Sequence, residues 1–324
     1  MGAQDSAKRI NRILNVPTVL LALAFLLPGL APTLFGWISG LLAIPVFCLL
    51  CLYGVQKGTV HVRNGAILAT TGAIMLHLLP GTLFSLTLVP LGFSFNRSAA
   101  ANEDEIQTAL KGLIVLGVSW FVFWTVYGTV QGINPYSQLL KVLDTGFAQT
   151  YEVYRDNTDI PLETLVNIER IVTELRAMIP KILPGVLMCT LLLTVWINLL
   201  GSISVLERLK PEALPWKKYS EWRLPDRLVW VSVIAGFAWA LGEGVISNAG
   251  LCLILVSTLL YFFQGLAVLI YFVDRWKTPL YLKILIYGIL ILQSYGLIIL
   301  SIAGLADVWI DFRRKHKKDA QPDN

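Results

Sequence analysis

Residues 183–205 read LPGVLMCTLLLTVWINLLGSISV, and this stretch contains no charged side chain. A helix needs ~20 mostly apolar residues to cross a lipid bilayer, so this segment by itself predicts a membrane span. The whole chain agrees, because 56% of its 324 residues are hydrophobic and 15% are charged, against roughly 45–50% and ~25% in soluble domains. This composition excludes a soluble enzyme, a disordered chain and a disulfide-rich secreted scaffold. The predicted fold class is all-α, a polytopic transmembrane helix bundle.

Apolar runs of similar length recur along the chain. They predict about eight to ten membrane segments, near residues 16–34, 37–55, 65–81, 82–97, 110–131, 183–205, 228–247, 249–273 and 281–306. Two stretches leave the count open. Residues 65–97 are broken at Pro80-Gly81 and cross once or twice, and residues 279–312 either cross once or fold back near Gln293.

Basic residues predict the orientation of these segments. Three of them precede the first run, which reads as a retained anchor, namely Lys8, Arg9 and Arg12. By the positive-inside rule the N-terminus is then cytoplasmic, and so are the later basic loops. Nine passes would place the basic tail 313–324 outside, against that rule, and we expect the tail inside. The predicted location is the inner membrane of a bacterium, with lipid as the main partner.

Residues 132–182 form the one sizeable extramembrane segment. Apolar residues recur there every three or four positions, as one face of a helix requires, first from Leu139 to Tyr154 and then from Leu162 to Ile179. The sequence Asp156-Asn157-Thr158-Asp159 supplies turn residues between the two halves. An external amphipathic helical hairpin is therefore predicted, either as a structural cap or as a docking site. The expected domains are residues 1–131, 132–182, 183–312 and 313–324.

Motifs that carry catalysis are absent from the sequence. It contains no Walker loop, no His-Glu-x-x-His and no Gly-x-Ser-x-Gly. Cys48 and Cys51 have Cys-x-x-Cys spacing, but they lie in an apolar span without a second pair, so no metal site is predicted. No catalytic residue and no cofactor is expected, and the missing folded basic domain argues against nucleic-acid binding. These absences favour a non-enzymatic protein without its own ATPase.

Polar residues at helical spacing suggest where a small molecule could bind. Thr194 and Asn198 share one face of the run at 183–205, Glu243 and Ser247 share a face of 228–247, and Gln264 lies in the next run. Polar groups inside a membrane are costly unless they meet a partner, so these faces either line an outward-opening solute site or serve close helix packing. Glu243 is the one charged side chain clear of the ends of the runs. The candidate solute-binding residues are Glu243, Asn198, Gln264, Thr194 and Ser247.

A second candidate function rests on the basic loop near residues 206–227. Its cations either set the topology and contact anionic lipid, or dock a soluble partner. The candidate docking residues are Arg208, Lys210, Lys217, Lys218 and Arg223. The two functions under consideration are thus a solute-binding or transport component and a non-catalytic membrane scaffold.

The chain from about residue 165 onward resembles the YybS-like family of predicted bacterial integral membrane proteins. The resemblance is carried by Pro180 and Pro184, by Asn198, by Trp222-Arg223-Leu224-Pro225, by Gln264-Gly265 and by the run from Gly304 to Arg313. It covers about half of the chain. The architecture that it implies is remotely similar to the substrate-binding components of energy-coupling-factor vitamin transporters, which by analogy favours a transport role.

Overall fold

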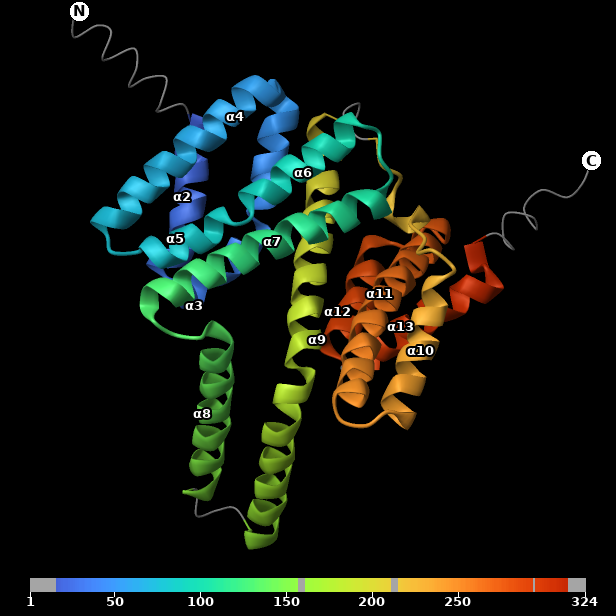
Figure 1. The fold of residues 1–324 in the computed structure, drawn as a ribbon. Coiled ribbons are helices and arrows are strands. Elements are labelled where there is room, and N and C mark those ends of the chain that lie inside the picture. Colours follow the sequence, from blue (N-terminus) through green and yellow to red (C-terminus); the bar gives the residue numbers. More distant parts are fainter. Residues whose placement is uncertain (1–15, 157–160, 211–214, 294, 314–324) are drawn as a thin grey trace, which may run out of the picture. The chain divides into compact units, whose positions relative to one another are not determined.

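The computed structural model describes residues 16–156, 161–210, 215–293 and 295–313, and these residues form helices and no strand. The first half contains α2 (Val16–Leu30), α3 (Pro32–Phe35), the 3-10 helix η1 (Gly36–Leu41), α4 (Ala43–Met75), α5 (Leu79–Leu86), α6 (Val89–Ala100) and α7 (Glu105–Gln131). The second half contains α8 (Pro135–Arg155), α9 (Leu162–Leu209), the 3-10 helix η3 (Tyr219–Glu221), α10 (Leu228–Leu241), α11 (Val245–Arg275), α12 (Leu280–Leu292) and α13 (Tyr295–Ile310) (Figure 1). The all-α class is confirmed.

The helices belong to two compact units. The first unit comprises residues 1–135 and 191–216, and the second comprises residues 136–190 and 217–324. Helix α9 contributes to both, because it runs without a break from Leu162 to Leu209. The expected domain boundary between residues 182 and 183 therefore lies inside one helix.

Among the described residues, four helices are long and apolar enough to cross a membrane, namely α4, α7, α9 and α11. Two bent pairs, α2 with the segment 32–41 and α12 with α13, raise this number to six if each pair is one span. The expected runs 37–55 and 65–81 both fall largely on α4, which changes direction at Gly54, where φ is 77° and ψ is 158°. The expected run 82–97 divides between the short helices α5 and α6. The runs 37–55 and 65–81 thus correspond largely to the two helical parts of α4, before and after Gly54.

Helix α7 shows how the chain meets lipid. Ile114, Phe121 and Val130 lie along it with 62%, 73% and 74% of their surface exposed. Exposed apolar side chains on a long apolar helix are stable in hydrocarbon and unfavourable in water. The chain is therefore a multi-pass membrane protein in contact with lipid.

The core of the first unit is aromatic. Phe47 lies edge-on to Phe95 with ring centroids 6.2 Å apart, and Trp216 packs on Phe47 at 5.6 Å. Gly92 allows α6 to approach α4 closely, since a Cβ there would lie 2.6 Å from a methyl carbon of Val46. Trp216 also donates from Nε1 to the carbonyl of Glu103 at 3.1 Å. These contacts join α4, α6 and the segment that follows α9.

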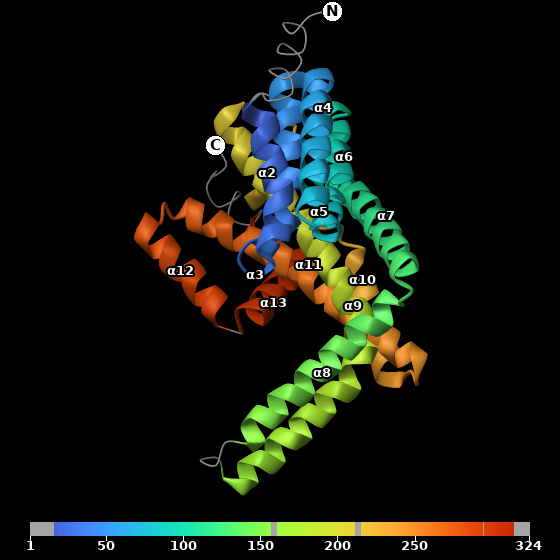
Figure 2. The ribbon, with the colours of Figure 1, turned by 90° about the vertical axis from the view of Figure 1, so that its left-hand side faces the viewer.

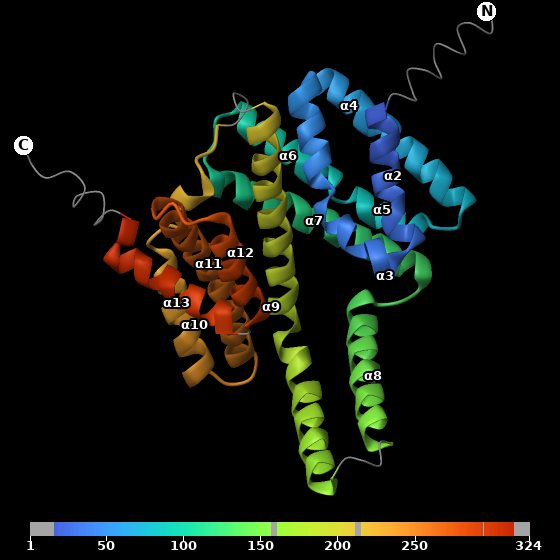
Figure 3. The same ribbon diagram turned by 180° about the vertical axis from the view of Figure 1, so that it is seen from behind.

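The predicted amphipathic hairpin is present in the second unit. Helix α8 and the N-terminal part of α9 lie side by side in Figures 2 and 3, and Arg176 donates to both carboxylate oxygens of Asp144, at 2.5 and 2.8 Å. No residue of α8 is fully buried. The predicted turn residues 157–159 lie outside the described residues, as do residues 1–15 and most of the basic tail.

Candidate functional site

Helices α11 and α13 cross at very short range because each has a glycine at the point of contact. A Cβ on Gly265 would lie 1.8 Å from the carbonyl oxygen of Leu300, and a Cβ on Gly304 would lie 2.0 Å from that of Tyr261. Neither position has room for a side chain, so the two backbones touch. This crossing brings Gln264, beside the first glycine, close to Asp307, one turn after the second.

Gln264 and Asp307 form a polar contact in an apolar interior. Gln264 is 3% exposed and Asp307 is fully buried. The amide Nε2 of Gln264 donates to Asp307 Oδ2 at 3.1 Å, and its Oε1 accepts from the backbone N–H of Leu224 at 3.3 Å. Because a buried carboxylate is costly without partners, this contact requires a further cation nearby.

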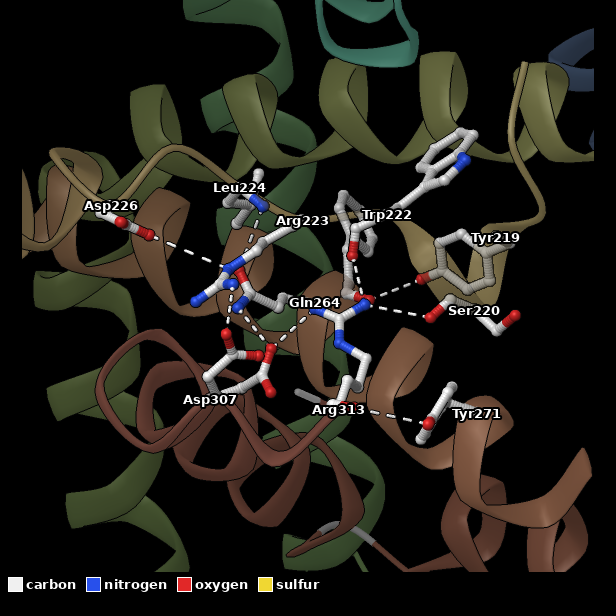
Figure 4. Close-up of polar contacts among 12 residues, drawn as sticks. Tyr219, Ser220, Trp222, Arg223, Leu224, Asp226, Gln264, Tyr271, Asp307 and Arg313 are labelled. Atoms are coloured by element: carbon white, nitrogen blue, oxygen red, sulfur yellow. Dashed lines mark hydrogen bonds and ion pairs between the residues drawn. The ribbon is translucent and has the colours of Figure 1, made fainter. Parts of the chain in front are cut away.

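Arg313 supplies that cation because the chain turns back after α13. Asp311 has φ of 48°, in the left-handed region that aspartate tolerates better than most residues. The turn places Arg313 Nη2 2.7 Å from Asp307 Oδ2. Its Nη1 donates to the carbonyls of Ser220 and Trp222, at 3.0 and 2.7 Å (Figure 4). Gln264, Asp307 and Arg313 are called the buried network below.

The loop after α9 is held against the buried network by further contacts. Tyr219 donates its hydroxyl to the carbonyl of Phe263 at 2.6 Å. Arg223 Nη1 donates to Asp311 Oδ2 at 3.0 Å, and Arg223 Nε lies 3.9 Å from Asp226 Oδ1. The Arg223 pairs are partly exposed and contribute little to stability by themselves. The loop is thus fixed chiefly by hydrogen bonds to its backbone.

A cleft of about 300 Å³ opens beside the buried network. Its walls carry both signs of charge and one phenol, and its lining residues are Lys217, Ser220, Glu221, Arg223, Tyr271, Asp311 and Arg313. Behind it, Asp307 Oδ1 is buried and has no hydrogen-bond partner among the described residues. Such a cleft can hold a small molecule that carries an anionic group, a cationic group or both.

The other candidate solute-binding residues lie elsewhere. Asn198 and Thr194 belong to the first unit, where the Asn198 amide donates to the carbonyls of Gly40 at 2.6 Å and Thr194 at 2.8 Å. Ser247 donates to the carbonyl of Trp239 at 3.0 Å, in the first turn of α11. At ~1.5 Å of rise per residue, Ser247 and Gln264 are about 25 Å apart along α11. Glu243 is exposed in the turn between α10 and α11.

The candidate docking residues also divide between the units. Lys217 and Arg223 line the cleft, and Lys218 is exposed beside them on the same loop. Arg208 and Lys210 lie at the end of α9 in the first unit, where Lys210 Nζ donates to the carbonyl of Cys51 at 3.2 Å. Two of the five basic residues therefore belong to the cleft.

Sequence reasoning missed Asp307, Arg313 and Tyr271 as site residues. Asp307 lies inside the apolar helix α13. The signal that identifies it is a carboxylate inside the apolar run Tyr295–Ile310, followed by arginine within two turns. An acid at that depth needs a partner, and the nearest cation in the sequence supplies it.

The family described as "Predicted membrane protein (DUF2232)" matches residues 18–308, which is most of the chain. No curated protein and no solved structure matches the chain.

Proposed function

The chain belongs to that family of predicted membrane proteins, and on this premise we propose that it binds a small charged solute in the cleft beside the buried network. The observation that carries the proposal is the cleft itself, which Arg313 lines while its guanidinium also pairs with the buried carboxylate of Asp307. A volume of about 300 Å³ suits a metabolite rather than a protein segment. We further propose a transport role in a bacterial inner membrane, where a partner would supply the energy.

The charges of the cleft define the class of solute. Lys217 and Arg223 offer donors to a carboxylate or phosphate, and Glu221 and Asp311 offer acceptors to an ammonium group. Tyr271 contributes a hydroxyl that can donate or accept. Because acidic and basic groups share one small space, a zwitterion such as an amino acid satisfies more of them than a singly charged ion. The resemblance to YybS-like proteins and, remotely, to vitamin-binding transport components supports a solute of this size.

Ligand-dependent thermal stability of the purified protein tests the proposal. A ligand that binds only the folded state at a hundred times its Kd stabilises it by ~2.7 kcal/mol, which is a measurable rise in Tm. We expect a rise with members of a panel of amino acids, carboxylates and phosphorylated metabolites. Lys217→Gln should reduce the effect, whereas Lys218→Gln should preserve it, because only Lys217 lines the cleft. If no member of the panel raises Tm, or if both variants behave alike, the proposal fails.

A scaffold that docks a soluble partner is the second candidate function. It is favoured by the fixed conformation of the loop, whose carbonyls at Ser220 and Trp222 are held by Arg313 while Lys218 stays exposed. Affinity purification in mild detergent separates the candidates. The scaffold is supported by a co-purified soluble complex that is lost with Lys217→Glu/Lys218→Glu and that does not respond to metabolites. Solute transport is supported by a co-purified transport ATPase.

A further inference from the structure

The first unit contains a cavity of its own, which lies where two helices are interrupted close to each other. The chain turns by 117° between α2 and the segment Pro32–Leu41. It turns again between α4 and α5, where His77 has φ of 56°. Between these breaks lies a cavity of about 360 Å³, lined by Pro28, Gly29, Pro32, Gly36, Ser39, His77, Leu78, Pro80, Gly81 and Phe84. Interrupted helices are where membrane proteins expose backbone groups to a bound molecule.

The lining of this cavity is mostly apolar. None of its lining residues is Asp, Glu, Lys or Arg. The polar side chains are His77, which offers ring nitrogens, and Ser39, whose hydroxyl donates to the carbonyl of Gly36 at 2.6 Å and keeps its lone pairs available. A charged ligand would therefore lose its hydration without gaining an ion pair. An uncharged ligand is favoured.

Phe84 lines the cavity and belongs to an aromatic cluster. Phe84 lies 5.3 Å from Phe123 and 5.9 Å from both Trp120 and Trp124, measured between ring centroids. These neighbours hold the Phe84 ring in place. The lining also includes glycines and proline rings. A planar molecule can stack on Phe84 in such a space.

Unpaired polar groups lie next to the cavity. Thr82 is fully buried, its Oγ1 has no partner among the described residues, and this oxygen would lie 3.7 Å from a Cβ on the cavity-lining Gly29. The indole N–H of Trp120, which packs on Phe84, is likewise buried without a partner in the described part of the chain. A buried polar group left unpaired costs ~1–3 kcal/mol.

From these observations we infer that the cavity binds a small uncharged planar ring compound that carries hydrogen-bond donors and acceptors, of the class of a heteroaromatic amide. The ring stacks on Phe84, and the polar groups of the compound face His77 and Ser39. The cavity and the cleft belong to different units, so this site does not depend on the solute site proposed above.

The test uses the full-length purified protein and three probes of similar size. Nicotinamide is planar and uncharged, nicotinate is planar and charged, and cyclohexanecarboxamide is uncharged but not planar. Saturation-transfer NMR reports binding of each probe. We expect nicotinamide to bind at least tenfold more tightly than either of the other two. Equal binding of all three probes, or no binding of nicotinamide, overturns the inference. The cavity would then be a space that detergent or lipid fills.

Variants locate the binding. Phe84→Leu should weaken nicotinamide binding by up to about tenfold, which corresponds to the ~0.5–1.5 kcal/mol of an aromatic contact. The matched control is Phe262→Leu in the second unit, which should change nothing. If Phe84→Leu does not fold, His77→Asn serves instead, because asparagine tolerates the left-handed conformation and removes the imidazole. Loss of nicotinamide binding confirms a separate site if the solute of the cleft still raises Tm. Unchanged nicotinamide binding in both variants overturns the inference.

Discussion

Gln264 donates a hydrogen bond to Asp307 across 3.1 Å, and both side chains are buried where α11 crosses α13. Asp307 also accepts from Arg313, which in turn holds the loop carbonyls of Ser220 and Trp222. Three sequence segments that are far apart in the chain therefore meet around one carboxylate. They are residues 222–225, 264–265 and 304–313.

The Asp307–Arg313 pair should be essential for the stability of the second unit. Arg313→Met leaves the Asp307 carboxylate buried without its cation, and breaking such a pair from one side costs about 3–5 kcal/mol. We expect a large loss of Tm or of folded yield, measured by size-exclusion chromatography with a heating series. The double variant Asp307→Leu/Arg313→Met removes both charges and should recover much of that loss. A double variant no more stable than Arg313→Met would show that the pair is not the reason for the loss.

The glycine crossing should tolerate no added methyl group. Gly265→Ala places a Cβ against the Leu300 carbonyl at 1.8 Å, so α11 and α13 must separate. Overpacking of this kind costs at least about 1–3 kcal/mol, and Tm should fall accordingly. The matched control is Gly236→Ala in α10, where nothing lies within 4 Å of the new Cβ. That control should be neutral or slightly stabilising, since alanine is the better helix former.

The sequence predicts those parts of the fold that depend on one helix at a time. Helix α7 and the α8–α9 hairpin follow from apolar runs and from periodicity within a single segment. The reversal at Gly54 does not follow, because glycine also occurs inside straight helices and its conformation depends on the tertiary contacts around it. The runs 37–55 and 65–81 appear separate in the sequence because Lys57 and Arg63 lie between them, and in the structure they fall largely on the two sides of Gly54.

The candidate site shows a different limit. Gln264 was identified as a polar residue that needs a partner, and the partner was sought on a neighbouring span at the same depth. Its actual partner, Asp307, lies on α13, and the two meet because Gly265 and Gly304 permit contact between backbones. Periodicity shows which face of a helix is polar but not which helix faces it. Arg313 was equally hard to place, since its position depends on the left-handed turn at Asp311.

The α8–α9 hairpin should open at acidic pH. The hydrogen bond from Arg176 lowers the pKa of Asp144 below its ordinary value of ~3.9. Because the pKa is depressed in the folded hairpin, the stabilisation is complete above the unfolded value and is lost as pH falls through the folded one. Spin labels at Gln149 and Glu169 should show a single narrow distance distribution at pH 7 and a broader one near pH 3. Asp144→Asn should give the broad distribution at both values, and a pH response that persists in this variant would assign the opening to other groups.

The orientation of the hairpin is a prediction from charge placement. On a cysteine-free background, a cysteine introduced at the exposed position Gln149 should react with an impermeant maleimide added outside intact cells. A cysteine at Lys218, on the loop beside the cleft, should react only after the membrane is opened. Both positions are exposed in the structure, so each serves as the accessibility control for the other. Labelling of Gln149→Cys from the cytoplasm alone would invert the predicted topology and place the cleft outside.

Glu243 separates the cleft from the site that polar periodicity alone suggested. It lies in the exposed turn before α11, about 30 Å along the direction of that helix from Gln264, and it does not line the cleft. If the solute binds at the cleft, Glu243→Gln and Glu243→Leu should leave the ligand-induced rise in Tm unchanged. If the carboxylate instead meets a cationic group of the solute, Glu243→Gln removes a charge-assisted hydrogen bond of ~1.5–3 kcal/mol and weakens binding by roughly ten- to a hundredfold. Titration of the two Glu243 variants and of Lys217→Gln with the same ligand decides between the two locations. Lys217→Gln should weaken binding only if the cleft is the site.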